Sequence, residues 1–325
     1  MVMNMSGNQF KPAWWLPNSH LQTIWPALCR SEIKNLPIER ERIELPDGDF
    51  IDLDWLGKNQ TGPIVVILHG FEGNIGSHYA KGMLSCIGKQ GWRGVFMHFR
   101  GCSGEPNRLP RGYHSGDTRD LAYIVNLLCI REPNTPLAAV GYSLGGNVLL
   151  KWLGETKGKN PLKAATAISV PFELQKAAQR LQRGFSRFYQ WYLIKCARER
   201  LLIKFDQGPS SIDKAQFSDV QNMQEFDGAY TVPMHGFSSI DEYYLSASSR
   251  HYLLTIQVPT LVVHAKDDPF MTEDIIPAED EVSKHVILEV SESGGHVGFV
   301  SGKYPWRAEY WLEERVPEFL RDFLK

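Results

Sequence analysis

The sequence predicts an α/β fold in which a mostly parallel central sheet is covered by helices on both faces. Short apolar runs recur along the chain, and their near-continuous apolarity is typical of strands that are buried on both sides. Helix-like segments with apolar residues three and four positions apart lie between several runs, as at 117–130 and 147–155. Alternating strands and helices favour a parallel sheet. The predicted buried strands are 63–70, 94–99, 137–142, 164–170, 259–265 and 286–290.

An antiparallel hairpin is predicted ahead of the first buried strand. Residues 38–45 (IERERIEL) and 49–56 (DFIDLDWL) alternate polar with apolar side chains, which is the pattern of strands with one exposed face. The segment PDGD at 46–49 is a turn signal. We therefore expect these two strands to form one edge of the sheet.

The regular alternation ends after Val170, and residues 171–258 contain no convincing buried strand. The first part of this insertion is helical in composition and carries apolar residues on more than one face, so we expect it to pack over another surface. Ligands of open α/β sheets bind outside the carboxyl ends of the strands, which favours a helical cap over that edge within a single domain spanning 1–325. The alternative is a helical layer unrelated to any site. The aromatic residues expected to roof the site are Phe185, Phe188, Trp191 and Tyr192.

Composition argues against several classes of protein. The net charge of −2 shows no basic excess, so no nucleic-acid partner is predicted. The five cysteines lack Cys-x-x-Cys spacing and are odd in number, which argues against disulfides and structural zinc and favours a reducing compartment, the cytoplasm.

Motifs for membrane insertion and for cofactors are also missing from the sequence. The first residues, MVMNMSGNQFKPAWW, do not read as a secretory signal, and no apolar window reaches the roughly 20 residues of a transmembrane segment. Phosphate-loop, dinucleotide and metal-ligand motifs are absent, so we expect neither a cofactor nor a metal ion.

A serine lies between glycines where a predicted strand passes into a predicted helix. Gly141, Ser143 and Gly145 match the pattern Gly-x-Ser-x-Gly of a nucleophile elbow. Glycine has no Cβ and therefore fits a turn that is too tight for other residues. The serine would stand at the helix amino terminus, where the helix dipole favours developing negative charge. Without that setting, the motif is a glycine-rich turn with an inert serine.

After this serine the chain carries first a candidate acid and then a candidate base, which is the order found in enzymes with a nucleophile elbow. Serine needs a base to accept its proton, and a neutral histidine held by a carboxylate commonly fills that role. Asp267 and Asp268 follow the strand at 259–265, and His296 follows the strand at 286–290. Adjacent side chains in an extended loop point in different directions, so only one aspartate can face the histidine.

Two backbone amides are expected to bind the oxyanion. One belongs to Leu144, the residue after the serine, and the other to a loop after an earlier strand. The segment HGFEG at 69–73 directly follows the strand residues PIVVIL at 63–68, so the Phe71 amide is the expected second donor. We interpret His69 as a residue that shapes this loop rather than as the base.

Several segments together resemble a group of the α/β-hydrolase superfamily that contains bacterial esterases and eukaryotic phospholipases and lipid esterases. The segments are GYSLGGN, HGFEG, HFRGCSGEPNR, LPNSHLQT, YHSGDTRD, DDPF and GGHVGF, and they cover nearly the whole chain. The resemblance implies a serine hydrolase acting on carboxylic esters, with Ser143 as nucleophile and His296 as base. It also implies that Asp268 orients the histidine, with Asp267 as the alternative.

Two other functions stay open beside ester hydrolysis. Some relatives resemble acyltransferases, which use the same triad to pass the acyl group to an alcohol. A hydrolase fold can also serve as a binding protein without activity, because a fold alone does not prove a function. If the cap aromatics roof the site, the expected partner is a small-molecule ester with an apolar acyl group.

Overall fold

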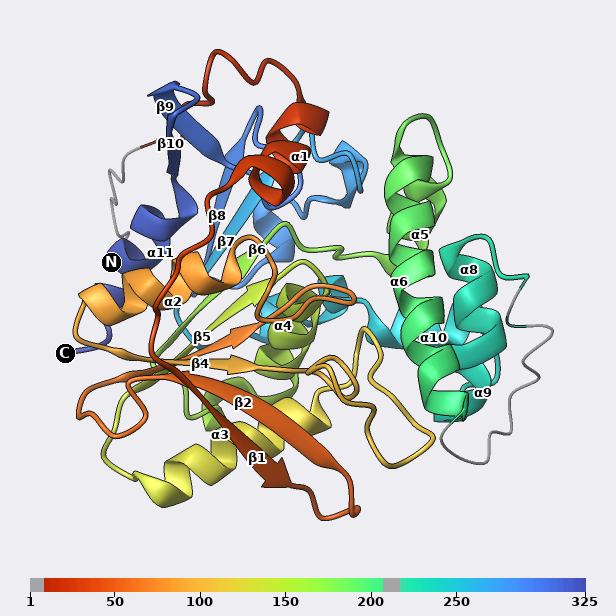
Figure 1. The fold of residues 1–325 in the computed structure, drawn as a ribbon, viewed down its shortest axis with the longest axis horizontal. Coiled ribbons are helices and arrows are strands. Elements are labelled where there is room, and N and C mark those ends of the chain that lie inside the picture. The colour runs from red at the N-terminus through yellow and green to blue at the C-terminus, as the bar shows by residue number, and fades with distance from the viewer. Residues whose placement is uncertain (1–8, 207–216, 218) are drawn as a thin grey trace.

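The computed structural model describes residues 9–206, 217 and 219–325, and an eight-stranded sheet runs through its centre (Figure 1). The strand order is β1-β2-β4-β3-β5-β6-β7-β8. Neighbouring strands from β4 to β8 pair in parallel, whereas β1 and β2 form an antiparallel hairpin at the edge. The predicted α/β class, the mostly parallel sheet and the edge hairpin are confirmed. The strands are β1 (Ile38–Glu44), β2 (Phe50–Leu56), β3 (Ile64–Leu68), β4 (Arg93–Met97), β5 (Leu137–Tyr142), β6 (Ala164–Ile168), β7 (Thr260–Ala265) and β8 (Val286–Ser291).

Helices cover both faces of the sheet. Val66 of β3 packs in one apolar core with Leu149 of α4, and Ile67 packs in the opposite core with Phe319 of α11. Successive side chains of a strand point to opposite faces, and both faces of the sheet are covered here. Every residue of β3 is therefore buried, which explains its uninterrupted apolar sequence. α3 lies on the same face as α4, and α2 lies on the same face as α11. These helices are α2 (Ala80–Lys89), α3 (Arg119–Arg131), α4 (Leu144–Thr156) and α11 (Leu312–Arg321).

The described residues between β6 and β7 form helices and no strand. Figure 1 shows most of these helices beyond the ends to which the arrows of β4 and β5 point. They bury apolar residues among themselves, such as Leu201 against Phe226, whereas Leu253 of η3 belongs to the core beside α4. The elements are α5 (Leu174–Leu181), α6 (Ser186–Asp206), α8 (Met223–Phe226), the π-helical η2 (Asp227–Thr231), α9 (Val232–His235), α10 (Ile240–Ala247) and η3 (Ser249–Thr255).

Two elements near the termini were not predicted from the sequence. They are α1 (Ser19–Cys29) and a two-stranded sheet of β9 (Val300–Tyr304) and β10 (Arg307–Tyr310). The Gln22 amide donates to the Val300 carbonyl at 3.0 Å and accepts from the Val300 N–H at 2.8 Å, so α1 holds the start of β9. Short 3-10 turns lie at η1 (Lys157–Lys159), η4 (Glu273–Ile275) and η5 (Glu279–Glu281).

None of the helices in the described part of the chain combines the length and the apolarity needed to cross a membrane. α6 is long enough, with 21 residues, but arginine and lysine side chains recur along it.

Candidate active site

Ser143 occupies the tight turn between β5 and α4. Its φ is +51° and its ψ is −117°, a backbone conformation that residues with a Cβ rarely adopt. The turn needs glycine on both sides of the serine. A Cβ at Gly145 would lie 2.5 Å from the carbonyl oxygen of His69, and one at Gly141 would lie 2.6 Å from the carbonyl oxygen of Gly145. The close approach of α4 to the end of β3 accounts for Gly145, and its close approach to β5 accounts for Gly141.

Three predicted side chains come together at this turn. Ser143 Oγ lies 3.0 Å from His296 Nε2, and His296 Nδ1 lies 2.8 Å from Asp268 Oδ2. The other carboxylate oxygen of Asp268 accepts from the Phe270 N–H at 2.8 Å. A carboxylate only accepts, so His296 Nδ1 carries the hydrogen and Nε2 presents its lone pair to the serine.

Asp267 turns away from the imidazole. Its Oδ1 accepts from the Gly295 N–H at 2.9 Å, and burial raises the pKa of this carboxyl. Asp267 therefore ties the loop after β7 to the loop that carries His296. The structure places Asp268, and not Asp267, against the histidine ring.

Two further residues hold His296 and were missed by the sequence analysis. Thr23 of α1 accepts from the His296 N–H at 2.9 Å, and Phe270 stacks on the imidazole with 3.9 Å between ring centroids. Thr23 lies in the segment LPNSHLQT, which contributed only to the family resemblance. Nothing in the spacing of that segment points to a histidine 273 positions away.

His69 shapes the loop after β3. Its Nε2 accepts from the Phe99 N–H at 3.0 Å, which leaves the hydrogen on Nδ1, and Nδ1 donates to the Gly70 carbonyl at 2.7 Å. Burial lowers the pKa of His69 to about 3, so the ring stays neutral. These contacts agree with the interpretation of His69 as a residue that shapes the loop.

Leu144 directly follows Ser143, and Gly70, which precedes Phe71, lies beside the serine, because a Cβ on Gly70 would lie 3.3 Å from Ser143 Cβ. The Gly70 carbonyl accepts from His69 and, at 3.0 Å, from the Gly73 N–H, so its direction is set inside the loop. The trans peptide then directs the Phe71 N–H to the opposite side. Leu144 is the first residue of α4, and an N–H in the first turn of a helix has no partner within that helix.

A cavity of about 780 Å³ contains both Ser143 and His296 in its wall. Phe71 and Leu144 also belong to the wall, so all of the predicted site residues except Asp268 reach it. The helices between β6 and β7 contribute mostly apolar side chains. The aliphatic and phenylalanine side chains among them are Leu174, Ala177, Ala178, Leu181, Phe188, Leu193, Met223 and Phe226, beside four tyrosines and the polar residues Arg200, Asp227 and Thr231.

The expectation that four aromatic residues roof the site was wrong for two of them. Phe188 and Tyr192 line the cavity, whereas Phe185 and Trp191 are absent from its wall, although all four side chains are about half exposed. Phe185 precedes the first residue of α6, and Trp191 is rotated by 100° from its neighbour Tyr192 around that helix, so neither shares the face that Phe188 and Tyr192 present to the cavity.

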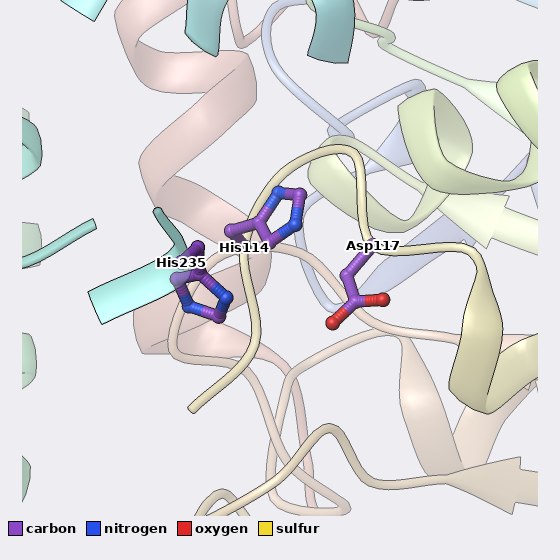
Figure 2. A group of neighbouring side chains, drawn as sticks. All are labelled: His114, Asp117 and His235. Atoms are coloured by element: carbon purple, nitrogen blue, oxygen red, sulfur yellow. The ribbon is translucent and has the colours of Figure 1, made fainter. Parts of the chain in front are cut away.

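A separate group of side chains that could ligate a metal ion includes none of Ser143, His296 and Asp268 (Figure 2). One ligand atom each from His114, Asp117 and His235 lies within 4.8 Å of the others, and burial lowers the pKa of His114 to about 4 and that of His235 to about 3. The Asp117 carboxylate is already paired with two guanidinium groups, Arg111 at 2.8 Å and Arg119 at 2.9 Å. A divalent cation would therefore meet two positive charges at its only carboxylate ligand.

Several known proteins with related sequences are named as esterases, phospholipases or lipases. Residues 63–303 match a family described as alpha/beta hydrolase fold. "Putative esterase YheT" of Escherichia coli K12 is 41% identical over 98% of this chain and 95% of its own length. "Phospholipase ABHD3" of Mus musculus is 30% identical over 93% of this chain and 75% of its own length. "Monoacylglycerol lipase" of Saccharomyces cerevisiae is 28% identical over 82% of this chain and 61% of its own length.

Solved structures agree at the level of the fold. An esterase of Pyrococcus furiosus, Pf2001, superposes with a TM-score of 0.58 at 17% identity, covering 98% of this chain and all of the other. The family match spans more than half of the sequence, and its residues 63–303 include the serine turn, the loop after β3 and the loop with His296. The chain therefore belongs to the alpha/beta hydrolase fold family.

Proposed function

We propose that this protein is a serine hydrolase that cleaves carboxylic esters through an acyl-enzyme intermediate. The observation that carries the proposal is the continuous set of contacts from Ser143 Oγ through His296 to Asp268, with 3.0 Å and 2.8 Å between the bonded atoms. Relatives that are named as esterases or lipases align with most of the chain, and they support the same reaction class.

The reaction proceeds in two halves. Ser143 Oγ attacks the ester carbonyl carbon while His296 Nε2 takes the hydroxyl proton, and Asp268 stabilises the imidazolium. His296 then returns this proton to the leaving alcohol as the C–O bond breaks. A water molecule attacks the acyl-enzyme in the same way, and the acid leaves as Ser143 regains its proton.

The Phe71 and Leu144 amides stabilise the oxyanion of both tetrahedral intermediates. Their supporting observation is position: a Cβ on Gly70 would lie 3.8 Å from Ser143 Oγ, so the Gly70–Phe71 peptide passes beside the nucleophile. Donors that are fixed before the reaction begins cost no reorganisation when charge develops, and one such donor is worth about 10²- to 10³-fold in kcat.

The substrate is a small-molecule ester with an apolar acyl group. We assign the helices between β6 and β7 the role of a cap within a single domain, because their side chains line the cavity beside Ser143. A cavity of about 780 Å³ with such a lining suits an acyl chain, since apolar pockets bind by removing apolar surface from water.

We place the protein in a reducing compartment, the cytoplasm, because all five cysteines are free thiols. The proposed reaction uses only side chains, backbone amides and water, so it requires no cofactor.

Fluorophosphonate labelling tests the proposal directly. We expect the wild type to be labelled and Ser143→Ala to resist labelling and to lose about 10⁴- to 10⁶-fold in ester turnover. Ser115→Ala is the matched control, because Ser115 lines the same cavity and has no histidine partner for its hydroxyl among the described residues. Retention of more than about a tenth of the activity by Ser143→Ala would contradict a covalent nucleophile.

A product analysis with the purified enzyme distinguishes hydrolysis from acyl transfer. With a p-nitrophenyl ester and an added alcohol, a hydrolase releases mainly free acid and an acyltransferase forms mainly the new ester. We expect free acid to dominate.

A further inference from the structure

The loop that carries the Phe71 amide is held from outside by α6. Arg200 forms a two-pronged ion pair with Glu72, with Nε at 2.7 Å from Oε2 and Nη2 at 2.8 Å from Oε1. The two side chains are only 13% and 6% exposed, so water screens this pair little. An arginine of the insertion is thereby bound to the residue directly after the proposed oxyanion donor.

Glu72 occupies a position where glycine would be the least strained choice. Its φ is +53°, and the Gly73 N–H closes the turn onto the Gly70 carbonyl at 3.0 Å. A four-residue turn with positive φ at its third residue normally carries glycine or asparagine there. A glutamate in that conformation costs free energy, and it persists only where surrounding contacts over-determine it.

Tyr113 supplies the second of these contacts from the opposite side. Its hydroxyl donates to Glu72 Oε1 at 2.9 Å and accepts from the Glu72 N–H at 2.9 Å. The Arg200 guanidinium also lies 5.5 Å from the centroid of the Tyr113 ring. Side chain and backbone of Glu72 are therefore both fixed between the body of the protein and α6.

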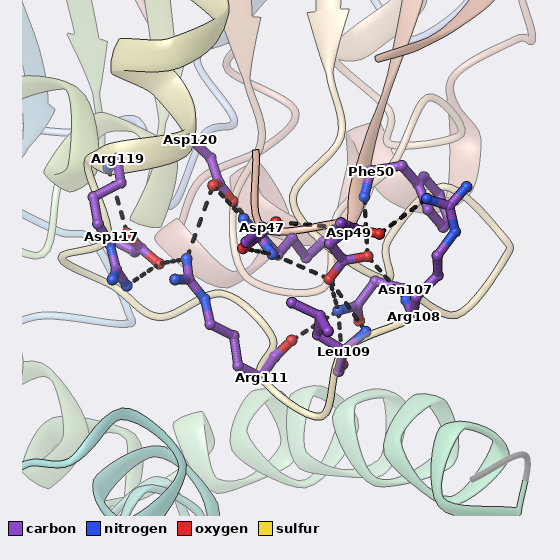
Figure 3. A network of polar contacts seen from close by, with 12 residues as sticks. Asp47, Asp49, Phe50, Asn107, Arg108, Leu109, Arg111, Asp117, Arg119 and Asp120 are labelled. Atoms are coloured by element: carbon purple, nitrogen blue, oxygen red, sulfur yellow. Dashed lines mark hydrogen bonds and ion pairs between the residues drawn. The ribbon is translucent and has the colours of Figure 1, made fainter. Parts of the chain in front are cut away.

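Hydrogen bonds tie the loop that contains Tyr113 to the turn of the β1–β2 hairpin (Figure 3). Asn107 Nδ2 donates to Asp49 Oδ2 at 2.6 Å, and the Arg108 N–H donates to Asp49 Oδ1 at 2.9 Å. The anchor on this side of Glu72 is thus bonded to the edge of the sheet. The anchor on the other side depends on where α6 sits.

We propose that Arg200 and Glu72 are positioning residues, which couple the seating of α6 to the oxyanion loop and so hold the Phe71 N–H in its productive direction. The inference rests on the proposed function, since Phe71 matters only if an oxyanion forms beside Ser143. The chain of contacts runs from Arg200 to the Glu72 carboxylate. It continues through the backbone of the turn to the Gly70–Phe71 peptide.

A second anchor on α6 makes the coupling separable from the docking of the helix itself. Lys204, one turn after Arg200, donates to Asn107 Oδ1 at 2.6 Å and to the Arg111 carbonyl at 3.2 Å. Lys204 does not contact Glu72 in the described part of the structure. Loss of Lys204 removes one polar contact of α6 but leaves the helix seated through Arg200 and through the buried core that contains Ile194 and Leu201, whereas loss of Arg200 frees the oxyanion loop directly.

The test compares Arg200→Met, Glu72→Gln, their double variant and the control Lys204→Met. The measurements are kcat and KM for a p-nitrophenyl ester. We expect both single variants to lose about 10- to 100-fold in kcat with KM changed less than about threefold, because a displaced donor forfeits part of what a whole donor contributes. The double variant should lose no more than the worse single variant, since both substitutions break one interaction. Lys204→Met should keep kcat within about threefold.

Arg200→Lys provides the conservative rescue. It keeps the charge and one donor to Glu72, and we expect it to recover at least about a third of the wild-type kcat. If Arg200→Met does not fold, as judged by circular dichroism, Glu72→Gln and Arg200→Lys carry the same comparison.

Three results would overturn the coupling: wild-type kcat in Glu72→Gln, an additive loss in the double variant, or an equal loss in Lys204→Met. Fluorophosphonate labelling keeps this inference apart from the proposed function. An unlabelled wild type refutes the hydrolase assignment itself, whereas a labelled wild type with unaffected variants refutes only the coupling.

Discussion

Replacing each aspartate after β7 by asparagine separates the residue that orients His296 from its neighbour. In Asp268→Asn, the carbonyl oxygen of the new amide is expected to keep the bond from the Phe270 N–H, which Oδ1 accepts at 2.8 Å. The amide nitrogen then replaces Oδ2, which lies 2.8 Å from His296 Nδ1. Because that nitrogen donates, the imidazole must present a bare Nδ1 and carry its hydrogen on Nε2.

The wrong tautomer cannot accept the Ser143 proton. Loss of the orienting carboxylate in a related triad costs about 10⁴ in kcat, which corresponds to about 5.4 kcal/mol of transition-state free energy. Asp267→Asn is the matched control. Its amide oxygen can still accept from the Gly295 N–H, now bonded at 2.9 Å, so we expect a loss of about threefold or less.

The assay is steady-state hydrolysis of a p-nitrophenyl ester at pH 7, with folding of each variant verified by circular dichroism. The ratio of the two kcat values should exceed about 10³. If Asp267→Asn is the inactive variant, the assignment of the two carboxylates is reversed. If both variants stay active, the acid lies elsewhere and the reasoning from the hydrogen bonds is refuted.

Three further substitutions test the packing, the electrostatics and the cavity. Gly145→Ala should destabilise the protein by about 3 kcal/mol or more in urea unfolding, because its Cβ would lie 2.5 Å and 2.7 Å from the carbonyl oxygens of His69 and Leu68; an unchanged midpoint would contradict the close approach. Burial raises the folded pKa of Asp227 from 3.8 to about 7, so the stability contributed by its protonated form is complete below pH 4 and is lost as pH rises through 7. Asp227→Asn should therefore gain stability relative to the wild type by at most about 1.4 kcal/mol per pH unit over that window, and a pH-independent difference would argue against the shift. Ala178→Trp should fill the cavity and lower kcat/KM for long acyl esters more than for acetate esters, and equal losses would place the acyl chain elsewhere.

The sequence by itself determined the sheet and the order of the reactive groups. Strands such as β5 are buried on both faces, so apolarity over six consecutive residues identified them without any partner in view. The glycines beside Ser143 carried information of the same local kind, because a tight turn excludes Cβ atoms whatever surrounds it. Asp268 and His296 were recognisable as candidates because each follows the end of a strand.

Only the tertiary structure decided between the two aspartates and identified the residues that support the site. Asp267 and Asp268 differ by one position, and their directions depend on how the loop after β7 packs against Gly295 and Phe270. Thr23 contacts a residue 273 positions away, and Arg200 meets Glu72 across 128 positions. Such pairings leave no periodic trace in a sequence, because they arise when elements that are distant along the chain fold onto the same edge of a sheet.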